Sequence, residues 1–349
     1  MATQADSLPG VSYVMPVLNE VDYVEAAVST VLSQDYAGEQ QLILALGPST
    51  DGTTDLVERL AAREPRVTFV HNPDTHIPVG MNLAVMKSRH PIIVRVDAHS
   101  ELAPGYTRRA IDTLKRSGAA NVGGLMKASG RSRFQMAVAR AYNSRFGLGG
   151  GTYHSGAKEG PAESAYLGVF KRSVLIEVGL YDESLRRGED WELNLRIRKA
   201  GHLVWFDPEL KVTYWPRENL NKLIRQFFTT GVWRGELVRR YRGRNPLRFF
   251  APPALVLTVA SSAIILVLQL TGAITGVTAI VASLVHLGVL AYGALLLWVS
   301  FVHDRGRTFR DRCIFLLVLP TMHLSWGFGF LVGLLRGGRD TMDTSRSNA

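Results

Sequence analysis

Ile92-Ile-Val-Arg95-Val-Asp97-Ala-His99 is an apolar run that ends abruptly on an acid, a small residue and a histidine. Its β-branched start is typical of a buried strand. Residues two apart on a strand share a face, so Asp97 and His99 present an oxygen and a nitrogen side by side at the strand's end. This pair suits a divalent metal, although the pattern alone fits a polar strand end in a turn equally well.

The segments before this stretch alternate between strand and helix patterns. Strands are predicted at 11–16, 41–46 and 67–71, and helices at 23–34, 54–64 and 78–87. Such alternation predicts βαβ units and an α/β fold with a mostly parallel sheet. Sheets of this kind bind ligands beyond the carboxyl ends of their strands, which is where Asp97 and His99 fall.

The usual phosphate-binding motifs are absent from the chain. No Gly-x-Gly-x-x-Gly joins the first strand to its helix, and no Gly-x-x-x-x-Gly-Lys occurs. Dehydrogenase and P-loop functions are therefore not supported. The glycine-rich stretch 147–163 is predicted to be a mobile surface loop near a ligand, with plain disorder as the alternative.

The second half of the soluble part contains an acidic motif at the start of a helix. Further strands are predicted at 121–124, 165–170, 203–206 and 212–215, with an amphipathic helix at 132–146. Gly188-Glu-Asp190 opens a helix that continues to Ala200. Acids in a first helical turn are favoured by the helix dipole, so capping is one interpretation. The other is that a carboxylate serves as a general base toward a substrate hydroxyl.

Composition indicates anionic partners and a membrane. The formal charge of +10 favours phosphate-bearing substrates or an anionic membrane face. Nucleic acid is not expected, because no zinc-finger or RNA-recognition signature is present. The single cysteine, Cys313, excludes an internal disulfide framework and a cysteine-based zinc site. The polar start of the chain predicts no secretory signal, so the first domain is expected in the cytoplasm.

The composition changes sharply near Phe250. Apolar runs at 251–271, 274–302 and 313–335 each reach the roughly 20 residues that a membrane helix needs, with a buried soluble bundle as the alternative. The arginine-rich loop 303–312 is expected on the cytoplasmic side. The last run would place the tail outside unless the run is re-entrant, and Pro320 leaves both arrangements open.

Four domains are therefore predicted. They are a cytoplasmic α/β domain at 1–215, a basic and aromatic interfacial segment at 216–250, a transmembrane region of about three helices at 251–335, and a polar tail at 336–349. The arginines and aromatics of the interfacial segment suit a headgroup surface, either as a simple anchor or as a grip on acceptor phosphates. His286 and His323 are interpreted as helix-packing residues.

Four motifs occur in a specific order: Pro16-x-x-Asn19-Glu20, Ser49-Thr-Asp51-Gly-Thr53, Asp97-x-His99 and Gly188-Glu-Asp190. Over residues 11–240 this set resembles the inverting family 2 glycosyltransferases of GT-A fold, a Rossmann-like sheet. It is most similar to the membrane-bound branch that includes succinoglycan glucosyltransferases. The resemblance implies transfer of a single sugar from a nucleotide sugar to a hydroxyl of a lipid-linked, polyprenyl-phosphate-type saccharide. The expected setting is envelope or exported polysaccharide synthesis at the inner or plasma membrane.

The resemblance also implies a role for each motif residue. Asp97 and His99 would hold a divalent metal on the diphosphate, and the carboxylate–imidazole pair favours Mn²⁺ over Mg²⁺. Asp190 would be the catalytic base, supported by Glu189. Residues expected to bind the nucleotide sugar are Pro16, Asn19, Glu20, Ser49, Asp51, Asn82, Arg95 and Asp97. Residues expected to contact the acceptor or its phosphate are Trp191, Gly168, Gln226, Trp233 and Arg234.

Two departures from the family pattern refine these expectations. Leu46 and Gly47 stand where many members have an Asp that binds uracil, so a UDP-sugar is expected while GDP and dTDP sugars stay open. Gln226 is followed by Trp233-Arg234 in place of the processive Gln-x-x-Arg-Trp motif, which favours single-sugar transfer. The rival functions are a polyprenyl-phosphate sugar synthase, whose anionic acceptor needs no base, and a non-catalytic membrane scaffold with a degenerate nucleotide fold.

Overall fold

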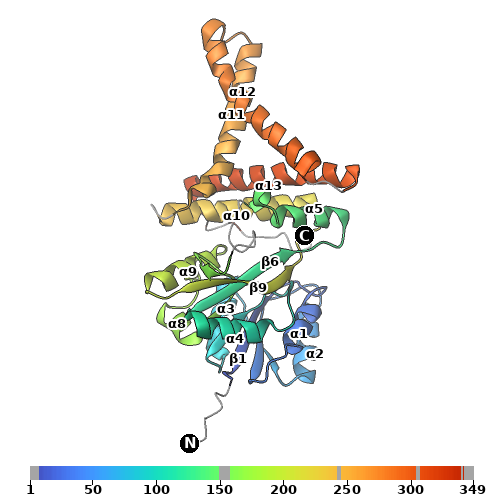
Figure 1. Ribbon diagram of the computed structural model, residues 1–349, viewed down its shortest axis with the longest axis vertical. Helices are drawn as coiled ribbons and strands as arrows, with labels where there is room; N and C mark the ends of the chain where they lie inside the picture. Colours follow the sequence, from blue (N-terminus) through green and yellow to red (C-terminus); the bar gives the residue numbers. More distant parts are fainter. Residues whose placement is uncertain (1–7, 149–157, 242–244, 304–306, 339–340, 342–349) are drawn as a thin grey trace, which may run out of the picture. The chain divides into compact units, whose positions relative to one another are not determined.

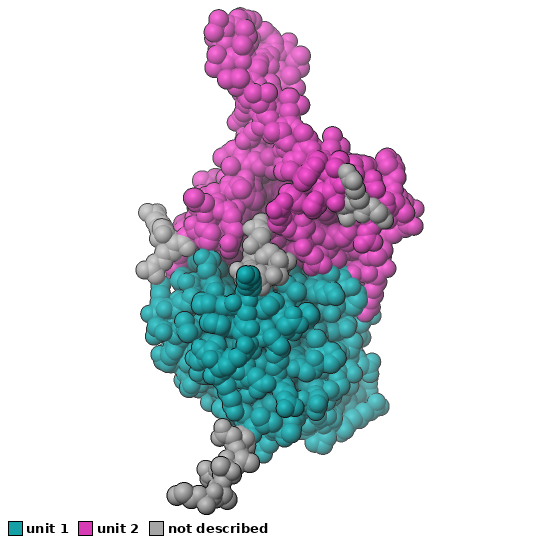
Figure 2. Space-filling model, in the orientation of Figure 1, with its two compact units in different colours: residues 1–129, 151–215 teal, residues 130–150, 216–349 magenta. Residues whose placement is uncertain are grey.

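The computed structural model describes residues 8–148, 158–241, 245–303, 307–338 and 341. The chain divides into two compact units, which Figure 2 shows in different colours. Unit 1 comprises residues 1–129 and 151–215, and unit 2 comprises residues 130–150 and 216–349. Part of the glycine-rich loop predicted at 147–163 lies outside the described residues.

Unit 1 contains a sheet and the helices that cover it (Figure 1). Its strands are β1 (Val11–Val17), β2 (Gln40–Leu46), β3 (Val67–His71), β4 (Ile92–Arg95), β5 (Ser100–Leu102), β6 (Asn121–Ala128), β7 (Gly160–Pro161), β8 (Tyr166–Lys171) and β9 (Val204–Tyr214). Its helices are α1 (Val24–Leu32), α2 (Thr53–Arg63), α3 (Ile77–Lys87), α4 (Tyr106–Ser117), α8 (Arg172–Glu177) and α9 (Glu189–Lys199).

The strand order places a topological switch beside β1. The order is β3-β2-β1-β4-β8-β6-β9-β5, with β7 beside β9. Strands β3, β2, β1 and β4 are parallel, and β8 is antiparallel to both β4 and β6. The chain winds outward from β1 to β3 and then returns to the other side of β1 as β4. The loops after β1 and β4 consequently diverge, which makes the carboxyl ends of these strands a natural ligand site.

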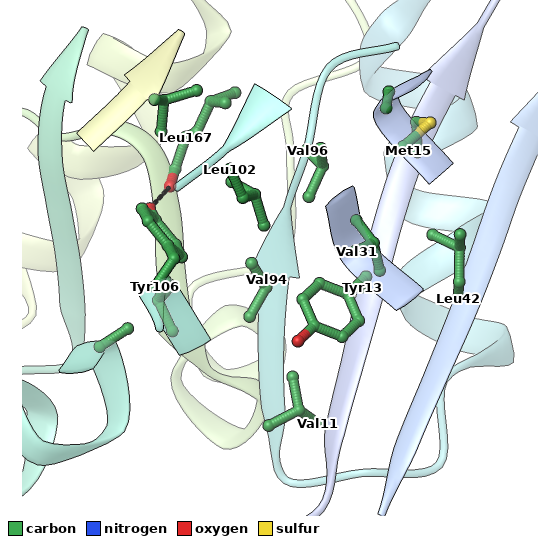
Figure 3. Packing of buried hydrophobic residues seen from close by; sticks show 14 of the residues in the cluster. Val11, Tyr13, Met15, Val31, Leu42, Val94, Val96, Leu102, Tyr106 and Leu167 are labelled. Atoms are coloured by element: carbon green, nitrogen blue, oxygen red, sulfur yellow. Dashed lines mark hydrogen bonds between the residues drawn. The ribbon is translucent and has the colours of Figure 1, made fainter. Parts of the chain in front are cut away.

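Apolar side chains fill both faces of the sheet. On one face Tyr13, Val94 and Val96 pack with Val31 of α1 and Tyr106 of α4 (Figure 3). The other face packs against α3, α8 and α9. Burial on both faces explains why β1, β2 and β4 are almost continuously apolar and do not alternate.

The structure corrects three details of the predicted elements. The strands predicted at 203–206 and 212–215 form one strand, β9, because a shift in its register with β6 accommodates the Asp207-Pro208 interruption. The helix predicted at 132–146 is broken after Tyr142, and the Ser144 hydroxyl accepts a bond from Phe146 N that starts a new turn. Helix α4 was not predicted, since charges separate its few apolar positions.

The described part of unit 2 is helical. It contains α5 (Arg133–Tyr142), α6 (Arg145–Leu148), α10 (Leu220–Arg240), a 3-10 turn (Leu247–Phe250), α11 (Ala251–Leu270), α12 (Gly276–Leu297), a π-helical turn (Trp298–His303) and α13 (Phe309–Arg336). Three of its helical segments are long and apolar enough to cross a membrane: Leu247–Leu270, Gly276–His303 and Phe309–Arg336. The protein is therefore suited to membrane association.

Candidate active site

The loops after β1 and β2 are joined at the switch point by side chains from the predicted nucleotide motifs. Asn19 adopts a left-handed backbone conformation (φ 53°), which asparagine tolerates better than most residues. Its Oδ1 accepts a hydrogen bond from Thr50 N at 2.8 Å, and its backbone N donates to Ser49 Oγ at 3.0 Å. These contacts bring the first and second predicted motifs together, near Pro16 at the end of β1.

Asp51 serves as the main tie between the two loops. Its carboxylate accepts bonds from Val21 N at 3.2 Å and from Thr53 N at 3.0 Å. Burial alone would raise the pKa of Asp51, but the bonds from Thr53 and Val21 outweigh it and hold the pKa below its ordinary value. Thr53 Oγ1 in turn accepts a bond from Glu20 N at 2.9 Å. In this structure Asp51 therefore stabilises the conformation of both loops through its hydrogen bonds to their backbone.

His99, just beyond β4, is oriented by a carboxylate from the loop after β1. Its Nδ1 lies 3.0 Å from Oε1 of Glu20, whose residue is only 6% exposed. The ring of Tyr214 packs edge-on against the His99 ring at a centroid distance of 5.7 Å. A carboxylate on one ring nitrogen is the usual arrangement for a histidine that ligates a metal through the other nitrogen.

Arg95 lies at the centre of a buried charged cluster. Although Arg95 is only 3% exposed, its guanidinium contacts three carboxylates. Nε donates to Asp97 Oδ1 at 3.2 Å, Nη2 donates to Glu189 Oε1 at 3.2 Å, and Nη1 donates to Asp190 Oδ1. The end of β4 and the start of α9 thus meet at one cation, which brings together the predicted metal motif and the predicted base.

The cluster holds more negative than positive charge, and this affects Asp190. Burial raises the pKa of Asp190 to about 7; Arg95 opposes the rise, while Glu189 and Asp97 add to it. The Asp190 side chain is nevertheless 26% exposed, so it can be reached from outside. A carboxyl group that titrates near neutral pH is suited to accept a proton from a substrate.

Local backbone geometry delivers the two acids to Arg95. Gly188 has a left-handed conformation (φ 78°), which only glycine adopts without cost, and it forms the N-cap of α9. Its neighbours Glu189 and Asp190 direct their carboxylates to Arg95, and no side chain caps this helix end. The contacts at this helix start therefore differ from those of a simple cap.

The side chains of Asp97 and His99 beyond β4 suit a metal ion that is also coordinated by a bound substrate. Within the described ranges, no group of three or more His, Cys, Asp or Glu side chains is placed to hold a metal. Asp97 and His99 would thus supply two ligands, and oxygens of a bound diphosphate or water would supply the rest. The orienting Glu20 and the excess negative charge around Arg95 fit such a cation.

The other predicted site residues have different surroundings. Asn82 bonds both backbone groups of Tyr181 at 2.9 Å and so holds the loop before α9. A Cβ at Gly168 would overlap the Phe170 ring, which makes this a packing position in β8. Trp191 is buried in the first turn of α9. The remaining predicted residues lie in unit 2, on α10: Gln226, Trp233 and Arg234.

The α10 residues make contacts within unit 2. Gln226 Oε1 accepts a bond from Tyr142 of α5 at 3.2 Å, and Trp233 Nε1 donates to Thr341 O at 3.1 Å. Arg234 stacks over the Phe249 ring at 4.2 Å. Gln226 and Trp233 are both buried.

One residue of the site escaped sequence reasoning. Tyr181 is 2% exposed, and its phenol interacts electrostatically with Asp190 and Arg95. It lies in an irregular segment without a motif, and only its pairing with Asn82 across the fold reveals it. A short-range sequence signal could not have identified this residue.

Comparison with known proteins identifies the family and the fold. The sequence profile of glycosyl transferase family 2 matches residues 12–179. The succinoglycan biosynthesis protein ExoA of Rhizobium meliloti is 31% identical over 325 residues, covering 92% of this chain and 94% of that protein. A dolichyl N-acetyl-alpha-D-glucosaminyl phosphate 3-beta-D-2,3-diacetamido-2,3-dideoxy-beta-D-glucuronosyltransferase of Methanococcus voltae is 24% identical over 240 residues, 66% of this chain and 74% of that protein.

A solved structure shares the fold over nearly the whole chain. It is the mannosyltransferase PcManGT from Pyrobaculum calidifontis in complex with GDP-Man and Mn²⁺, with a TM-score of 0.62 and 18% identity. The alignment covers 95% of this chain and 90% of that one. The predicted GT-A architecture is thereby confirmed.

Proposed function

This chain belongs to glycosyl transferase family 2, and on that premise we propose that it transfers one sugar from a nucleotide sugar to a hydroxyl of a lipid-linked saccharide. A UDP-sugar is the first donor to test, and the anomeric configuration is inverted. The observation that carries this proposal is the Arg95 cluster, in which one guanidinium contacts both Asp97, the proposed metal ligand, and Asp190, the proposed base.

In the proposed reaction Asp190 removes the proton from the acceptor hydroxyl. The acceptor oxygen forms a bond to the anomeric carbon while the bond from that carbon to the diphosphate breaks, and the nucleoside diphosphate leaves with the electron pair. Asp190 retains the proton until it passes to solvent. A positioned base of matched pKa contributes about 10²–10⁴-fold to the rate of such a step.

Arg95 acts in this proposal as a positioning residue. Its three nitrogen donors fix the separation between Asp97, Glu189 and Asp190 before any substrate binds. Glu189, which is 8% exposed, adds negative charge beside Asp190 and so supports its affinity for a proton. Preorganisation of this kind is effective because misplacing a reacting group by about 1 Å can cost 10²-fold in rate.

Asp97 and His99 would hold a divalent cation, with Glu20 orienting the His99 ring. When bound, such an ion neutralises the charge that develops on the leaving diphosphate. The mixed oxygen and nitrogen donors favour Mn²⁺ over Mg²⁺, and Mn²⁺ is the ion present with PcManGT. Asn19, Ser49 and Asp51 would shape the nucleotide pocket through the joined loops.

The relatives support the acceptor class and the setting. The name of the Methanococcus voltae enzyme describes a sugar carried on dolichyl phosphate, and ExoA serves succinoglycan biosynthesis. We therefore place this activity in envelope or exopolysaccharide synthesis at the inner or plasma membrane, with unit 1 on the cytoplasmic face. The arginine-rich sequence stretch 303–312 accords with that orientation.

A panel of nucleotide sugars tests the proposal. Purified full-length protein would be heated with UDP-, GDP- and dTDP-sugars, each with and without Mn²⁺, and the true donor should raise the melting temperature only together with the metal. The stabilising donor would then be offered with a polyprenyl-diphosphate saccharide or with polyprenyl phosphate. Transfer to the saccharide that Asp190→Asn abolishes supports the proposal. Transfer to polyprenyl phosphate alone, unaffected by Asp190→Asn, would identify a polyprenyl-phosphate sugar synthase instead.

A further inference from the structure

Helix α13 differs from α11 and α12 in what surrounds it. By composition all three can span a membrane, but 39% of the most apolar part of α13 is buried within the protein, against 11% for the segment containing α11 and none for that containing α12. The exposed sides of α11 and α12 suit lipid contact. The neighbours of α13 indicate a different position for it.

Glycines bring α13 and α10 into direct backbone contact. Gly231 and Gly235 on α10 are one turn apart, as are Gly329 and Gly333 on α13. A Cβ built on any of these four glycines would overlap a backbone carbonyl of the other helix. Glycines spaced four apart permit such close approach of two helices. The C-terminal half of α13 therefore runs along α10.

Helix α10 is too charged to cross a bilayer. Within its 21 residues it carries Lys222, Arg225, Arg234, Glu236, Arg239 and Arg240. Charges at this density are excluded from the hydrocarbon core but suit the headgroup layer. Because the two backbones touch, the C-terminal half of α13 must share the depth of α10.

The N-terminal half of α13 rests on a second charged helix. Arg140 of α5 donates to Asp311 O at 2.8 Å and lies over the Phe315 ring at 4.8 Å. Arg133 of α5 lies 3.4 Å from the Asp311 carboxylate. Both halves of α13 thus pack against helices that carry arginine.

The α11–α12 hairpin meets α13 at the middle of its length. A Cβ on Gly327 would overlap the carbonyl of Pro252, in the first turn of α11. His323 Nδ1 lies 2.8 Å from the hydroxyl of Tyr292 on α12. Helices α11 and α12 therefore each contact α13 near the middle of its length. Figure 1 shows α13 lying along α10 while α11 and α12 project away from this pair.

The outward side of α13 is apolar. Leu317, Phe328 and Leu335 are 48%, 56% and 82% exposed, and their spacing places them within about 20° of one another around the helix. Trp326 lies beside Phe249, which Arg234 covers at 4.2 Å. Tryptophan with arginine is typical of the membrane interface, whereas a spanning α13 would put Trp326 near the bilayer centre.

We propose that α13 lies in the membrane surface beside α10, turning Leu317, Phe328 and Leu335 toward the acyl chains. Helices α11 and α12 alone cross the bilayer. The partner of the α10–α13 surface is the lipid headgroup layer, and the chain beyond Arg336 stays on the same side of the membrane as unit 1.

Cysteine labelling in intact cells tests the sidedness. In a Cys313→Ser background, single cysteines would be introduced as Glu58→Cys on α2, Ala273→Cys between α11 and α12, and Ala349→Cys in the tail. A membrane-impermeant maleimide should label Ala273→Cys from one side, and both Glu58→Cys and Ala349→Cys only after permeabilisation. Labelling of Ala349→Cys together with Ala273→Cys from the same side would overturn the proposal.

Depth measurements provide a second test that does not depend on the tail. Nitroxide labels at Leu317, Phe328 and Leu335 should all report a similar, shallow depth in lipid vesicles. Matched labels would be placed on α11 at Leu257, Ile264 and Leu270, which are also exposed. Their membrane depth should be greatest at Ile264. Depths at Leu317 and Phe328 equal to that at Ile264, with Leu335 at the surface, would show that α13 spans the bilayer.

Discussion

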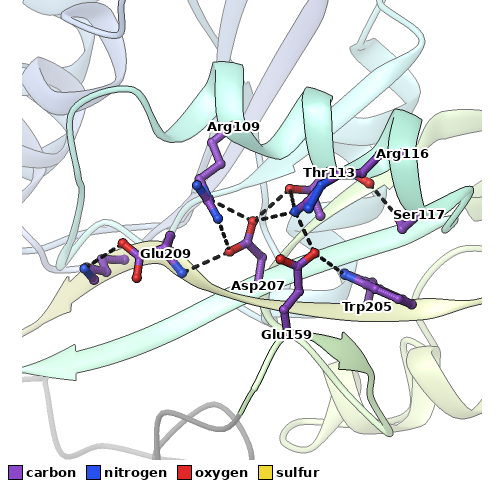
Figure 4. Close-up of polar contacts among 9 residues, drawn as sticks. Arg109, Thr113, Arg116, Ser117, Glu159, Trp205, Asp207 and Glu209 are labelled. Atoms are coloured by element: carbon purple, nitrogen blue, oxygen red, sulfur yellow. Dashed lines mark hydrogen bonds and ion pairs between the residues drawn. The ribbon is translucent and has the colours of Figure 1, made fainter.

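Unit 1 contains two charged clusters, each built around a buried group, and the two central groups have opposite charge. At the end of β4, one cation, Arg95, contacts three carboxylates. Under α4, one carboxylate, Asp207, is fully buried and accepts bonds from Arg109 at 2.8 and 2.9 Å and from the Thr113 hydroxyl at 2.8 Å (Figure 4). Arg116 lies 3.4 Å from Asp207 and pairs more closely with a second carboxylate, Glu159, at 2.6 Å.

The two clusters differ in how well their charges are matched. Burial would raise the pKa of Asp207, but its bonds to Arg109 and Thr113 outweigh it and hold the pKa below its ordinary value. For Asp190 burial prevails over Arg95, and the pKa is raised. A buried carboxylate whose acceptors are saturated contributes to the scaffold, whereas an under-neutralised and partly exposed one is suited to chemistry.

Replacing Asp190 by asparagine should give the largest functional difference between the two clusters. Asp190→Asn should lower kcat by about 10²–10⁴-fold, because the acceptor hydroxyl loses its base. Donor binding, measured by calorimetry, should be nearly unchanged. The melting temperature should hold or rise, since one of three crowded carboxylates is removed. Full turnover in this variant would refute the assignment of the base.

Arginine-to-lysine exchanges compare the two cations. Arg95→Lys keeps the charge but cannot direct three donors to three carboxylates, so kcat should fall by about 10²-fold while the KM for donor changes little. Arg109→Lys is the matched control and should lower thermal stability without changing the kcat of the folded enzyme. Equal effects of both variants on kcat would argue against a positioning role for Arg95.

Two histidine–carboxylate pairs offer a comparison for the metal. Glu20 orients His99 at 3.0 Å in a buried setting, and Glu177 contacts His202 at the same distance on the surface. Glu20→Gln should weaken Mn²⁺ binding by about 10–100-fold, as measured by calorimetry with donor present. Glu177→Gln should leave it unchanged. If both variants bind Mn²⁺ like the parent, His99 is not a ligand oriented by Glu20.

Replacing Asp207 by asparagine should lower the stability of the protein without lowering its rate of sugar transfer. Asp207→Asn leaves Arg109, Thr113 and the backbone N of Glu209 with poorer acceptors, which should cost about 1–3 kcal/mol of unfolding free energy. Denaturant unfolding of the detergent-solubilised protein would measure this loss. Transfer activity at a temperature where the variant is folded should match the parent, and a large fall in kcat would show that this cluster also serves the reaction.

The smallest expected effects come from pH, which should act in opposite directions on Asp190 and Asp207. Transfer requires unprotonated Asp190, so kcat should rise about tenfold per pH unit below pH 7 and level off above it. The raised pKa means that the native state holds this proton more tightly than the unfolded chain, so this group's contribution to stability declines as pH rises toward 7. The contribution of Asp207 to stability depends on pH in the opposite direction. Because its pKa is lowered, that contribution declines as the pH falls into the acidic range. Asp190→Asn should remove the step in kcat near pH 7.

Much of unit 1 could be predicted from local patterns. The apolar runs of β1, β2 and β4 and the helical spacing between them indicate a sheet buried on both faces, because periodicity records burial directly. The motif residues Asn19, Asp51 and Asp97 follow the predicted strands, and the ends of parallel strands meet at one edge. Helix α4 escaped prediction, since its charges obscure a narrow apolar face.

The sequence by itself determined the alternating fold, the placement of the motifs after the strands and the presence of apolar helices long enough for a membrane. Only the tertiary structure showed that Arg95 joins Asp97 to Asp190, residues 93 positions apart, and that Asp207 forms an opposite cluster with α4. It alone revealed that α13 packs along α10. The physical reason is that hydrophobic periodicity is a local property of the chain, whereas the pairing of charges and of glycine faces depends on which distant segments the fold brings into contact.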